Sequence, residues 1–251
     1  MIKAVLFDVD DTLIDYGKAE RDGITAYLRS LAVACDPAAA VARFGELQGY
    51  YFDRYLAGLI DYVGQATALA AAMIDWLELS PLDDPYDWFL GYRRHYEASL
   101  TLFPDVLDGL AALGDIPLGI VTNSDSVYTR VKLRRTGLLA RFDCIVGVDT
   151  AGVSKPHPRI FQSACAEMGH LPAVVAYVGD KKLSDAQAAD CAGLHGVWLN
   201  RSNDGAGGLT DLRQLATALG LCPDRSPSHR ATVAAGVQSG VIGAEVAACD
   251  G

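Results

Sequence analysis

Five short apolar runs recur along the chain, and each is long enough for one buried strand. They lie at residues 4–7, 118–121, 145–148, 174–178 and 196–199. Because the runs are continuously apolar rather than alternating, we expect helices to cover both faces of the sheet that they form. Helical patterns separate the runs, and this alternation predicts an α/β fold with a doubly wound, Rossmann-like parallel sheet.

Two of the intervening helices carry clear boundaries in the sequence. Apolar residues recur with helical spacing from Ile160 to Met168, where Pro158 suits the first turn and Gly169 suits the end. A second stripe, formed by Val106, Leu107, Leu110 and Ala111, stops at Gly114. These signals predict one helix before the second apolar run and one before the fourth.

Residues 16–99 interrupt this rhythm. They hold many of the aromatic residues, look helical almost throughout, and contain no apolar run typical of a strand. We therefore predict a core of residues 1–15 and 100–221 with a helical cap of residues 16–99 inserted in it. The aromatic residues are expected to pack the cap. Residues 222–251 follow a polar segment with two prolines and are expected to be a weakly ordered tail.

Composition excludes several classes of partner. The net charge of −10 over 251 residues disfavours nucleic acid, because phosphate neutralisation needs clustered lysine and arginine. No apolar stretch is long enough for a membrane helix, and no signal peptide is evident. The six cysteines form no Cys-x-x-Cys pair, so we expect small buried hydrophobes in a reduced, cytoplasmic protein. A monomer and a homodimer are both compatible with this composition.

Polar side chains with complementary chemistry lie at the ends of the predicted strands. Asp8 and Asp180 each follow an apolar run, Thr122 follows another, and Lys155 lies in a loop just before a predicted helix. Ligands of open parallel sheets bind outside the carboxyl ends of the strands, so one crevice is expected to hold all four. Carboxylates are hard ligands that suit Mg²⁺. The predicted site therefore combines a magnesium ion with an anionic substrate.

This set of groups is suited to phosphoryl transfer. With Mg²⁺ reducing the repulsion between anions, Asp8 is placed to attack phosphorus. Lys155 and the Thr122 hydroxyl are expected to hold the phosphoryl oxygens where charge accumulates. Asp10 lies two residues from the nucleophile and is expected to protonate the leaving alcohol and then activate water.

The ordered motifs resemble those of the haloacid dehalogenase superfamily of hydrolases. They read Asp8-Val9-Asp10-Asp11-Thr12, then Thr122-Asn123, then Lys155-Pro156-His157-Pro158-Arg159-Ile160-Phe161, and finally Gly179-Asp180 through Asp185. The resemblance covers about residues 1 to 200 and includes a helical cap after the first motif. It implies an aspartyl-phosphate on Asp8, Asp10 as general acid/base and main-chain metal ligand, and Asp180 and Asp185 as metal-site acids. The resemblance also implies that Thr122, Asn123 and Lys155 bind the phosphate.

The residue at position 10 distinguishes branches of this superfamily. The dehalogenases lack an acid there, whereas phosphatases and phosphosugar mutases both keep it, so the resemblance disfavours halide release. A phosphatase of a small phosphorylated metabolite is favoured as the commoner activity of the two. A phosphosugar mutase of the same superfamily and a non-catalytic protein that binds such a metabolite are the alternatives. The fourth motif departs from the family pattern, because Ala188 occupies a position that is usually glycine. A modest displacement of Asp185 is therefore expected.

Several further polar residues have two interpretations. Asn123 and Ser124 either bind phosphate or cap the helix that starts near Ser126. Asp11 and His157 suit either a catalytic role or a loop position, and Lys181 and Lys182 either attract a substrate anion or are simply exposed, with the structural interpretation favoured. The basic run Lys132, Arg134 and Arg135 is interpreted as a solvated helix face. Substrate specificity is assigned to the cap, with Tyr16, Lys18, Arg21, Arg54, Arg93, Arg94 and His95 as candidates that also suit surface positions.

Overall fold

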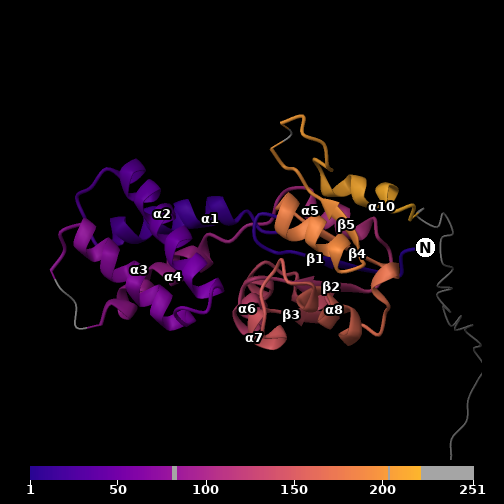
Figure 1. Cartoon of the computed structure of the whole chain (residues 1–251). Coiled ribbons are helices and arrows are strands. Elements are labelled where there is room, and N and C mark those ends of the chain that lie inside the picture. The colour runs from indigo at the N-terminus through magenta and orange to yellow at the C-terminus, as the bar shows by residue number, and fades with distance from the viewer. Residues whose placement is uncertain (81–83, 203, 222–251) are drawn as a thin grey trace, which may run out of the picture.

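The computed structural model describes residues 1–80, 84–202 and 204–221, and its centre is a five-stranded parallel sheet. The strand order is β3-β2-β1-β4-β5 (Figure 1). The strands are β1 (Ala4–Phe7), β2 (Leu118–Val121), β3 (Cys144–Val146), β4 (Val175–Gly179) and β5 (His195–Trp198). The predicted doubly wound α/β fold is confirmed, and β1 and β2 have the predicted bounds. The other three strands differ by one or two residues; Val148, predicted to end β3, instead begins α7 (Val148–Ala151).

Helices cover both faces of the sheet, which explains why the strands are continuously apolar. Val5 and Phe7 of β1 pack in one cluster with α5 (Val106–Ala111) and α10 (Leu215–Ala218). Ala4 and Leu6 point to the opposite face and pack against α8 (Pro158–Glu167) and α9 (Ala188–Cys191). Because successive strand residues alternate between faces, both sets must be apolar. The remaining core elements are α6 (Ser126–Arg135), the 3₁₀ turns Leu139–Arg141, Pro172–Val174 and Leu212–Gln214, and a π-helical turn at Lys182–Gln187.

The predicted helix boundaries correspond to observed ones. His157 caps α8, its Nδ1 accepting a hydrogen bond from the Arg159 N–H, and Pro158 is the first helical residue. Gly169, with a φ of +70°, follows the end of α8, and Gly114, with a φ of +68°, follows α5. Two residues of the predicted apolar stripe were wrongly assigned, because Leu107 is 55% exposed and Ala111 is exposed too.

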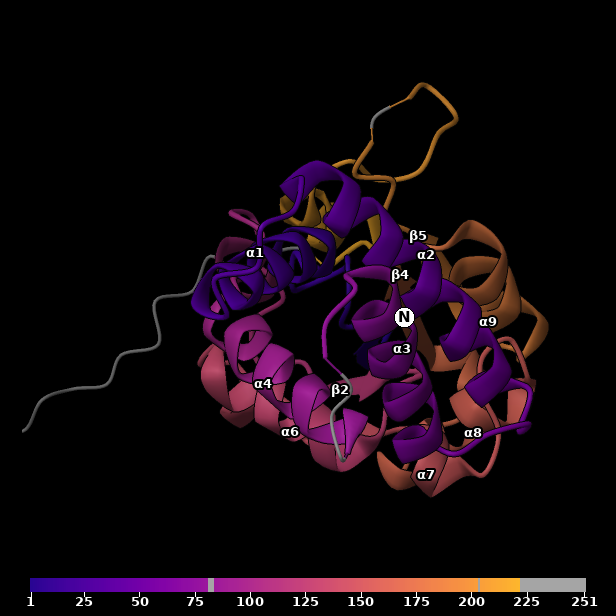
Figure 2. The same ribbon diagram turned by 90° about the vertical axis from the view of Figure 1, so that its left-hand side faces the viewer.

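Of the five helices described between β1 and β2 in the chain, the first four form a lobe beside the sheet (Figures 1 and 2). They are α1 (Tyr16–Ser30), α2 (Pro37–Leu56), α3 (Tyr62–Trp76) and α4 (Pro85–Ala98). Each begins after an aspartate whose side chain accepts a backbone N–H of the first turn, namely Asp15, Asp36, Asp61 and Asp84. Their apolar faces form a cluster of their own. This separate cluster supports the proposal that residues 16–99 are a cap.

The cysteines agree only partly with the prediction of small buried hydrophobes. Cys144 and Cys165 are buried, Cys35 is half-buried, and Cys191 is exposed. The prediction is wrong for Cys191, the last residue of α9, because only Ala188 and Ala189 of that short helix are buried. Cys222, Cys249 and the predicted tail of residues 222–251 lie outside the described residues. Within the described ranges, no helix is long and apolar enough to cross a membrane.

Candidate active site

The carboxyl ends of three adjacent strands bring the predicted groups together. Asp8 follows β1, Thr122 follows β2 and Asp180 follows β4, and β1 pairs with both of the other strands. The ladder continues into these residues, since the Asp8 N–H donates to the Val178 carbonyl at 2.9 Å and the Thr122 N–H donates to the Val146 carbonyl at 3.0 Å. Asp8 and Thr122 are therefore held by backbone hydrogen bonds at one edge of the sheet.

Lys155 reaches this edge from the loop before α8. Its Nζ donates to Oδ1 of Asp8 at 2.7 Å, to Oδ1 of Asp185 at 2.7 Å and to the Tyr177 hydroxyl at 2.8 Å. The side chain is almost fully buried. A buried ammonium is tolerated only with such close partners, so these ion pairs determine where the lysine lies. Tyr177 was not predicted, although a hydroxyl within an apolar run was a signal for it.

Asn123 fixes the loop that carries Lys155. Its side-chain amide donates to the Lys155 carbonyl at 3.1 Å, and its Oδ1 accepts the Lys155 N–H at 2.6 Å. The helix-cap interpretation of Asn123 and Ser124 is wrong, because the Asp125 carboxylate caps α6 by accepting the N–H groups of Val127 and Tyr128. An aspartate one residue closer to the helix satisfies those donors first.

Three carboxylates form a cluster with the donor chemistry of a cation site. One oxygen each from Asp8, Asp180 and Asp185 lie within 4.8 Å of one another. Burial raises the pKa of Asp8 to about 6, against the attraction of the Lys155 ammonium. Burial, followed by repulsion from Asp8 and Asp185, raises the pKa of Asp180 to about 7. One lysine leaves excess negative charge among three acids, and hard oxygen ligands around such charge fit a divalent cation.

Asp185 lies within the site despite the alanine at position 188. It is fully buried, and its Oδ2 accepts the Lys181 N–H at 2.9 Å while its Oδ1 accepts from Lys155. Gly179 makes this approach possible, because a Cβ there would lie 2.5 Å from Cγ of Asp185. The expected displacement of Asp185 does not remove it from the cluster.

Asp10 pairs with a lysine that sequence reasoning placed in solvent. Nζ of Lys132 donates to the two Asp10 carboxylate oxygens at 2.8 and 2.6 Å, and Lys132 is only 2% exposed. The prediction of a solvated basic face is therefore wrong for Lys132, because its partner lies 122 residues away and only the fold brings them together. The Asp10 side chain lies outside the three-acid cluster. Its proposed main-chain contact with a metal stays a prediction.

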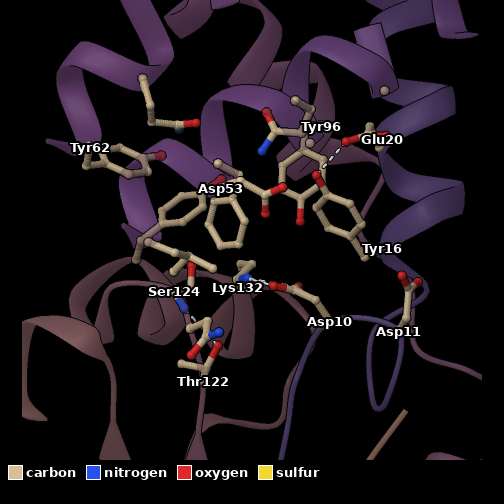
Figure 3. Close-up of a pocket in the computed structure, with 18 of the residues that line it drawn as sticks. Asp10, Asp11, Tyr16, Glu20, Asp53, Tyr62, Tyr96, Thr122, Ser124 and Lys132 are labelled. Atoms are coloured by element: carbon tan, nitrogen blue, oxygen red, sulfur yellow. Dashed lines mark hydrogen bonds and ion pairs between the residues drawn. The ribbon is translucent and has the colours of Figure 1, made fainter. Parts of the chain in front are cut away.

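A cavity of about 370 Å³ opens between this edge of the sheet and the cap. Asp8, Asp10, Thr122 and Lys155 line it on the sheet side. Figure 3 shows Thr122, Ser124, Lys132 and Asp10 on that side and Tyr62, Tyr96 and Glu20 facing them from the cap. Both the predicted chemical groups and the cap therefore contribute walls to one cavity.

The other candidates divide between this cavity and the surface. Of the predicted cap residues, Tyr16 and Arg93 line the cavity, and Lys18, Arg21, Arg54, Arg94 and His95 do not. Asp11 lines it too, in a left-handed conformation with a φ of +59°, and accepts the Gly17 N–H at 3.0 Å. Burial raises the pKa of Asp11. Lys181 and Lys182 are exposed, as predicted, although Lys181 reaches the cavity rim.

Comparison with known proteins agrees with this geometry. The model of the haloacid dehalogenase-like hydrolases matches residues 2–193. The chain is 33% identical over 201 residues to a phosphoglycolate phosphatase of Nitrosospira multiformis, covering 77% of this chain and 81% of that protein. It is 32% identical over 216 residues to a glyceraldehyde 3-phosphate phosphatase of Methanopyrus kandleri, covering 80% and 85%.

A solved structure from another branch has the same fold. The L-2-haloacid dehalogenase of Xanthobacter autotrophicus superposes with a TM-score of 0.64 at 26% identity, covering 87% of this chain and 88% of that one. The family match spans the core and the cap, and the phosphatase relatives confirm the prediction of a phosphoric monoester hydrolase. The chain therefore belongs to the haloacid dehalogenase-like hydrolases.

Proposed function

We propose that this protein is a magnesium-dependent phosphatase that hydrolyses a small phosphorylated metabolite through an aspartyl-phosphate on Asp8. The observation that carries the proposal is the Asp8 carboxylate at the floor of the cavity, 2.7 Å from Nζ of Lys155 and within the three-acid cluster. The names of the phosphatase relatives, which specify phosphoglycolate and glyceraldehyde 3-phosphate, support the class of substrate.

In the proposed reaction an Asp8 oxygen attacks phosphorus, and the bond from phosphorus to the substrate oxygen breaks. Lys155 offsets the negative charge on Asp8 and on the phosphoryl group. The Thr122 oxygen accepts the Ser124 N–H at 3.1 Å, which leaves the Thr122 hydroxyl hydrogen for a phosphoryl oxygen. Water then attacks phosphorus and releases phosphate, which restores the Asp8 carboxylate.

Mg²⁺ is the proposed cation, with Asp8 and Asp180 as side-chain ligands and Asp185 beside them. When bound, Mg²⁺ would shield the repulsion between the carboxylates and the phosphate and polarise the phosphoryl oxygens. Thr12 supports this arrangement, because its hydroxyl oxygen accepts the Asp180 N–H at 3.1 Å and so fixes the loop. The Asp180 carbonyl in turn accepts from Nε1 of Trp198 at 2.8 Å.

Asp10 is the proposed proton carrier. It lines the cavity, and its side chain is 29% exposed, so it can reach both the leaving oxygen and water. It gives its proton to the departing alcohol and later takes one from the attacking water. The acid at position 10 also weighs against dehalogenation, because halide release requires no proton donor.

The experiment is phosphate release from a panel of phosphorylated metabolites, with Mg²⁺ and with chelator, by the wild type and Asp8→Asn. Uncatalysed monoester hydrolysis is so slow that enhancements up to about 10²¹-fold are known, so even weak catalysis is measurable. We expect release that requires Mg²⁺ and is lost in Asp8→Asn. Asp115→Asn is the matched control, since it removes an exposed carboxylate that does not line the cavity.

Three outcomes would contradict the proposal. Release that persists in Asp8→Asn would exclude the aspartyl-phosphate, and release unaffected by chelator would exclude the metal. Transfer of phosphate to a second sugar hydroxyl, rather than to water, would indicate a mutase.

A further inference from the structure

The cap side of the cavity differs in chemistry from the sheet side. Six aromatic residues of α1–α4 line it, namely Tyr16, Phe52, Tyr62, Phe89, Tyr92 and Tyr96, and Tyr128 of the core helix α6 packs against the cap beside them. Two acids, Glu20 and Asp53, lie on the same side (Figure 3). Aromatic walls favour ring-bearing occupants, because ring faces stack on them and lose water on both sides.

Two of the lysines that line the cavity are held by acids on the sheet side. Lys132 pairs with Asp10, and Lys155 pairs with Asp8 and Asp185. Lys181 is exposed at the cavity rim, on the same side as Asp8 and Asp11, and so lies with the phosphoryl site rather than with the cap.

Arg93 is the cation that the cap contributes. Its Nε lies 3.7 Å from Glu97, and its guanidinium lies over the Tyr128 ring at 5.6 Å. With Glu20 and Asp53 on the same wall, a carboxylate or a second phosphate on the leaving group would lie beside two acids and one cation that is shared with Glu97 and the Tyr128 ring. Such a group would lose its hydration in a wall whose acids outnumber its cation.

Gln65 offers a second, independent signal. It lies on α3, lines the cavity and is 2% exposed. Its Oε1 is buried and has no hydrogen-bond partner among the described residues. Buried acceptors in proteins are nearly always hydrogen-bonded, so we expect a bound ligand to donate a hydrogen bond to this one. Because the Gln65 side chain lines the cavity and Oε1 makes no bond within the protein, a donor on a bound ligand would supply the partner that Oε1 lacks.

We propose that the cap side of this cavity binds an uncharged, ring-bearing leaving group with hydrogen-bond donors, and that it rejects carboxylate leaving groups. This inference rests on the proposed phosphatase function. Gln65 accepts a hydroxyl or N–H of the leaving group, Glu20 and Asp53 accept others, and the aromatic walls contact the ring. A sugar and a nucleoside both provide this chemistry. Phosphoglycolate, the substrate in the name of one relative, does not.

The first experiment compares kcat/KM for a hexose 6-phosphate, a ribonucleoside 5′-monophosphate, phenyl phosphate and phosphoglycolate. We expect one of the two donor-bearing ring esters to exceed phosphoglycolate by about 100-fold, because a site without a matching partner rejects a polar group strongly. Whichever of these two esters has the higher kcat/KM shows whether the leaving group is a sugar or a nucleoside. A value for phosphoglycolate equal to or above both ring esters would overturn the inference and leave the phosphatase function intact.

Two variants test the residues. Gln65→Leu removes the acceptor at similar volume and is expected to lower the kcat/KM ratio of the better ring ester to phenyl phosphate about tenfold, the effect of one hydrogen bond. Asp53→Arg changes an exposed acid to a cation. It is expected to raise the kcat/KM for phosphoglycolate relative to that for the ring ester about tenfold. Ratios that stay constant in both variants would contradict the assignment.

Glu46→Arg is the matched control for Asp53→Arg. It lies on the same helix, is exposed, makes the same charge change and does not line the cavity, so its ratios should equal those of the wild type. No release from any of the four esters would contradict the proposed function itself. Calorimetric binding of the same esters to Asp8→Asn then decides the leaving-group preference separately, and equal or tighter binding of phosphoglycolate would overturn it.

Discussion

The two walls of the cavity are built in opposite ways. On the sheet side, Lys155 satisfies Asp8 and Asp185 at once, and Lys132 satisfies Asp10, so the charged groups are held by one another. On the cap side, Gln65 lines the same cavity as the aromatic residues, and its Oε1 has no partner among the described residues. A wall whose polar groups are paired is preorganised for chemistry, whereas a wall with an unpaired acceptor is completed by its ligand. Under the proposed function, catalysis belongs to the sheet side and selectivity to the cap side.

Loss of Lys155, which holds the sheet side of the cavity together, is expected to have the largest effect on activity. Lys155→Met should lower kcat/KM by about 10³-fold, because the phosphoryl group loses a buried cation and Asp8 faces Asp185 without one. Phosphate-release kinetics would measure this. Lys182→Met is the control, since Lys182 is exposed over the Trp198 ring and does not line the cavity. A loss of less than tenfold would show that the sheet side does not depend on this ion pair.

The metal-free protein should become less stable as pH rises. The pKa values of Asp8 and Asp180 are raised from 3.8 to about 6 and about 7, so the folded state holds protons that the unfolded state has released. Their stabilising contribution is complete below about pH 4 and is lost as pH rises through the folded-state values. Between pH 5 and pH 8 we expect a loss on the order of 3 kcal/mol.

Urea denaturation with chelator at the two pH values measures this loss. Mg²⁺ should reverse it at pH 8, because a bound cation takes the place of the protons. Asp180→Asn should flatten the pH dependence. Metal-free stability that is constant or rises between pH 5 and pH 8 would argue against an uncompensated acid cluster.

Lys132 should act through Asp10 rather than on the phosphate. Lys132→Met is expected to lower kcat for alkyl monoesters by about 100-fold, the lower end of the contribution of general acid–base catalysis. The loss should be smaller for p-nitrophenyl phosphate, whose leaving group needs little protonation. Arg134→Met, at an exposed position on the same helix, is the control. Equal losses for both kinds of ester would mean that Lys132 has only a structural role.

The smallest effect is expected from packing within the cap. Leu69 is fully buried in the cluster formed by α1–α4, and Leu69→Ala should lower the free energy of unfolding of that unit by about 2 to 3 kcal/mol. Hydrogen exchange should show faster exchange in α1–α4 with little change in β1 and β2. Uniform acceleration across both regions would indicate one cooperative unit and contradict the division into core and cap.

Sequence reasoning succeeded where local pattern and chain order carry the information. The runs 4–7 and 118–121 predicted β1 and β2, and Asp8 and Thr122 occupy the strand ends at which parallel topology collects polar groups. It failed for residues whose surroundings come from distant parts of the chain. Lys132 looks like one of several helical cations, and its burial depends on Asp10. Gln65 looks like a polar position on α3, and its burial depends on packing against other helices.

By itself, the sequence determined the α/β architecture, the order of the chemical motifs and the edge of the sheet at which they gather. The architecture follows from hydrophobic periodicity, which is a pattern of a few neighbouring residues. The edge at which the motifs gather follows from the geometry of parallel strands. Only the tertiary structure decided the ion pair of Lys132 with Asp10, the contact of Tyr177 with Lys155, and the cavity that Gln65 lines together with the aromatic residues. The free energies of burial and charge pairing depend on groups brought together from far apart, so they exist only once the chain has folded.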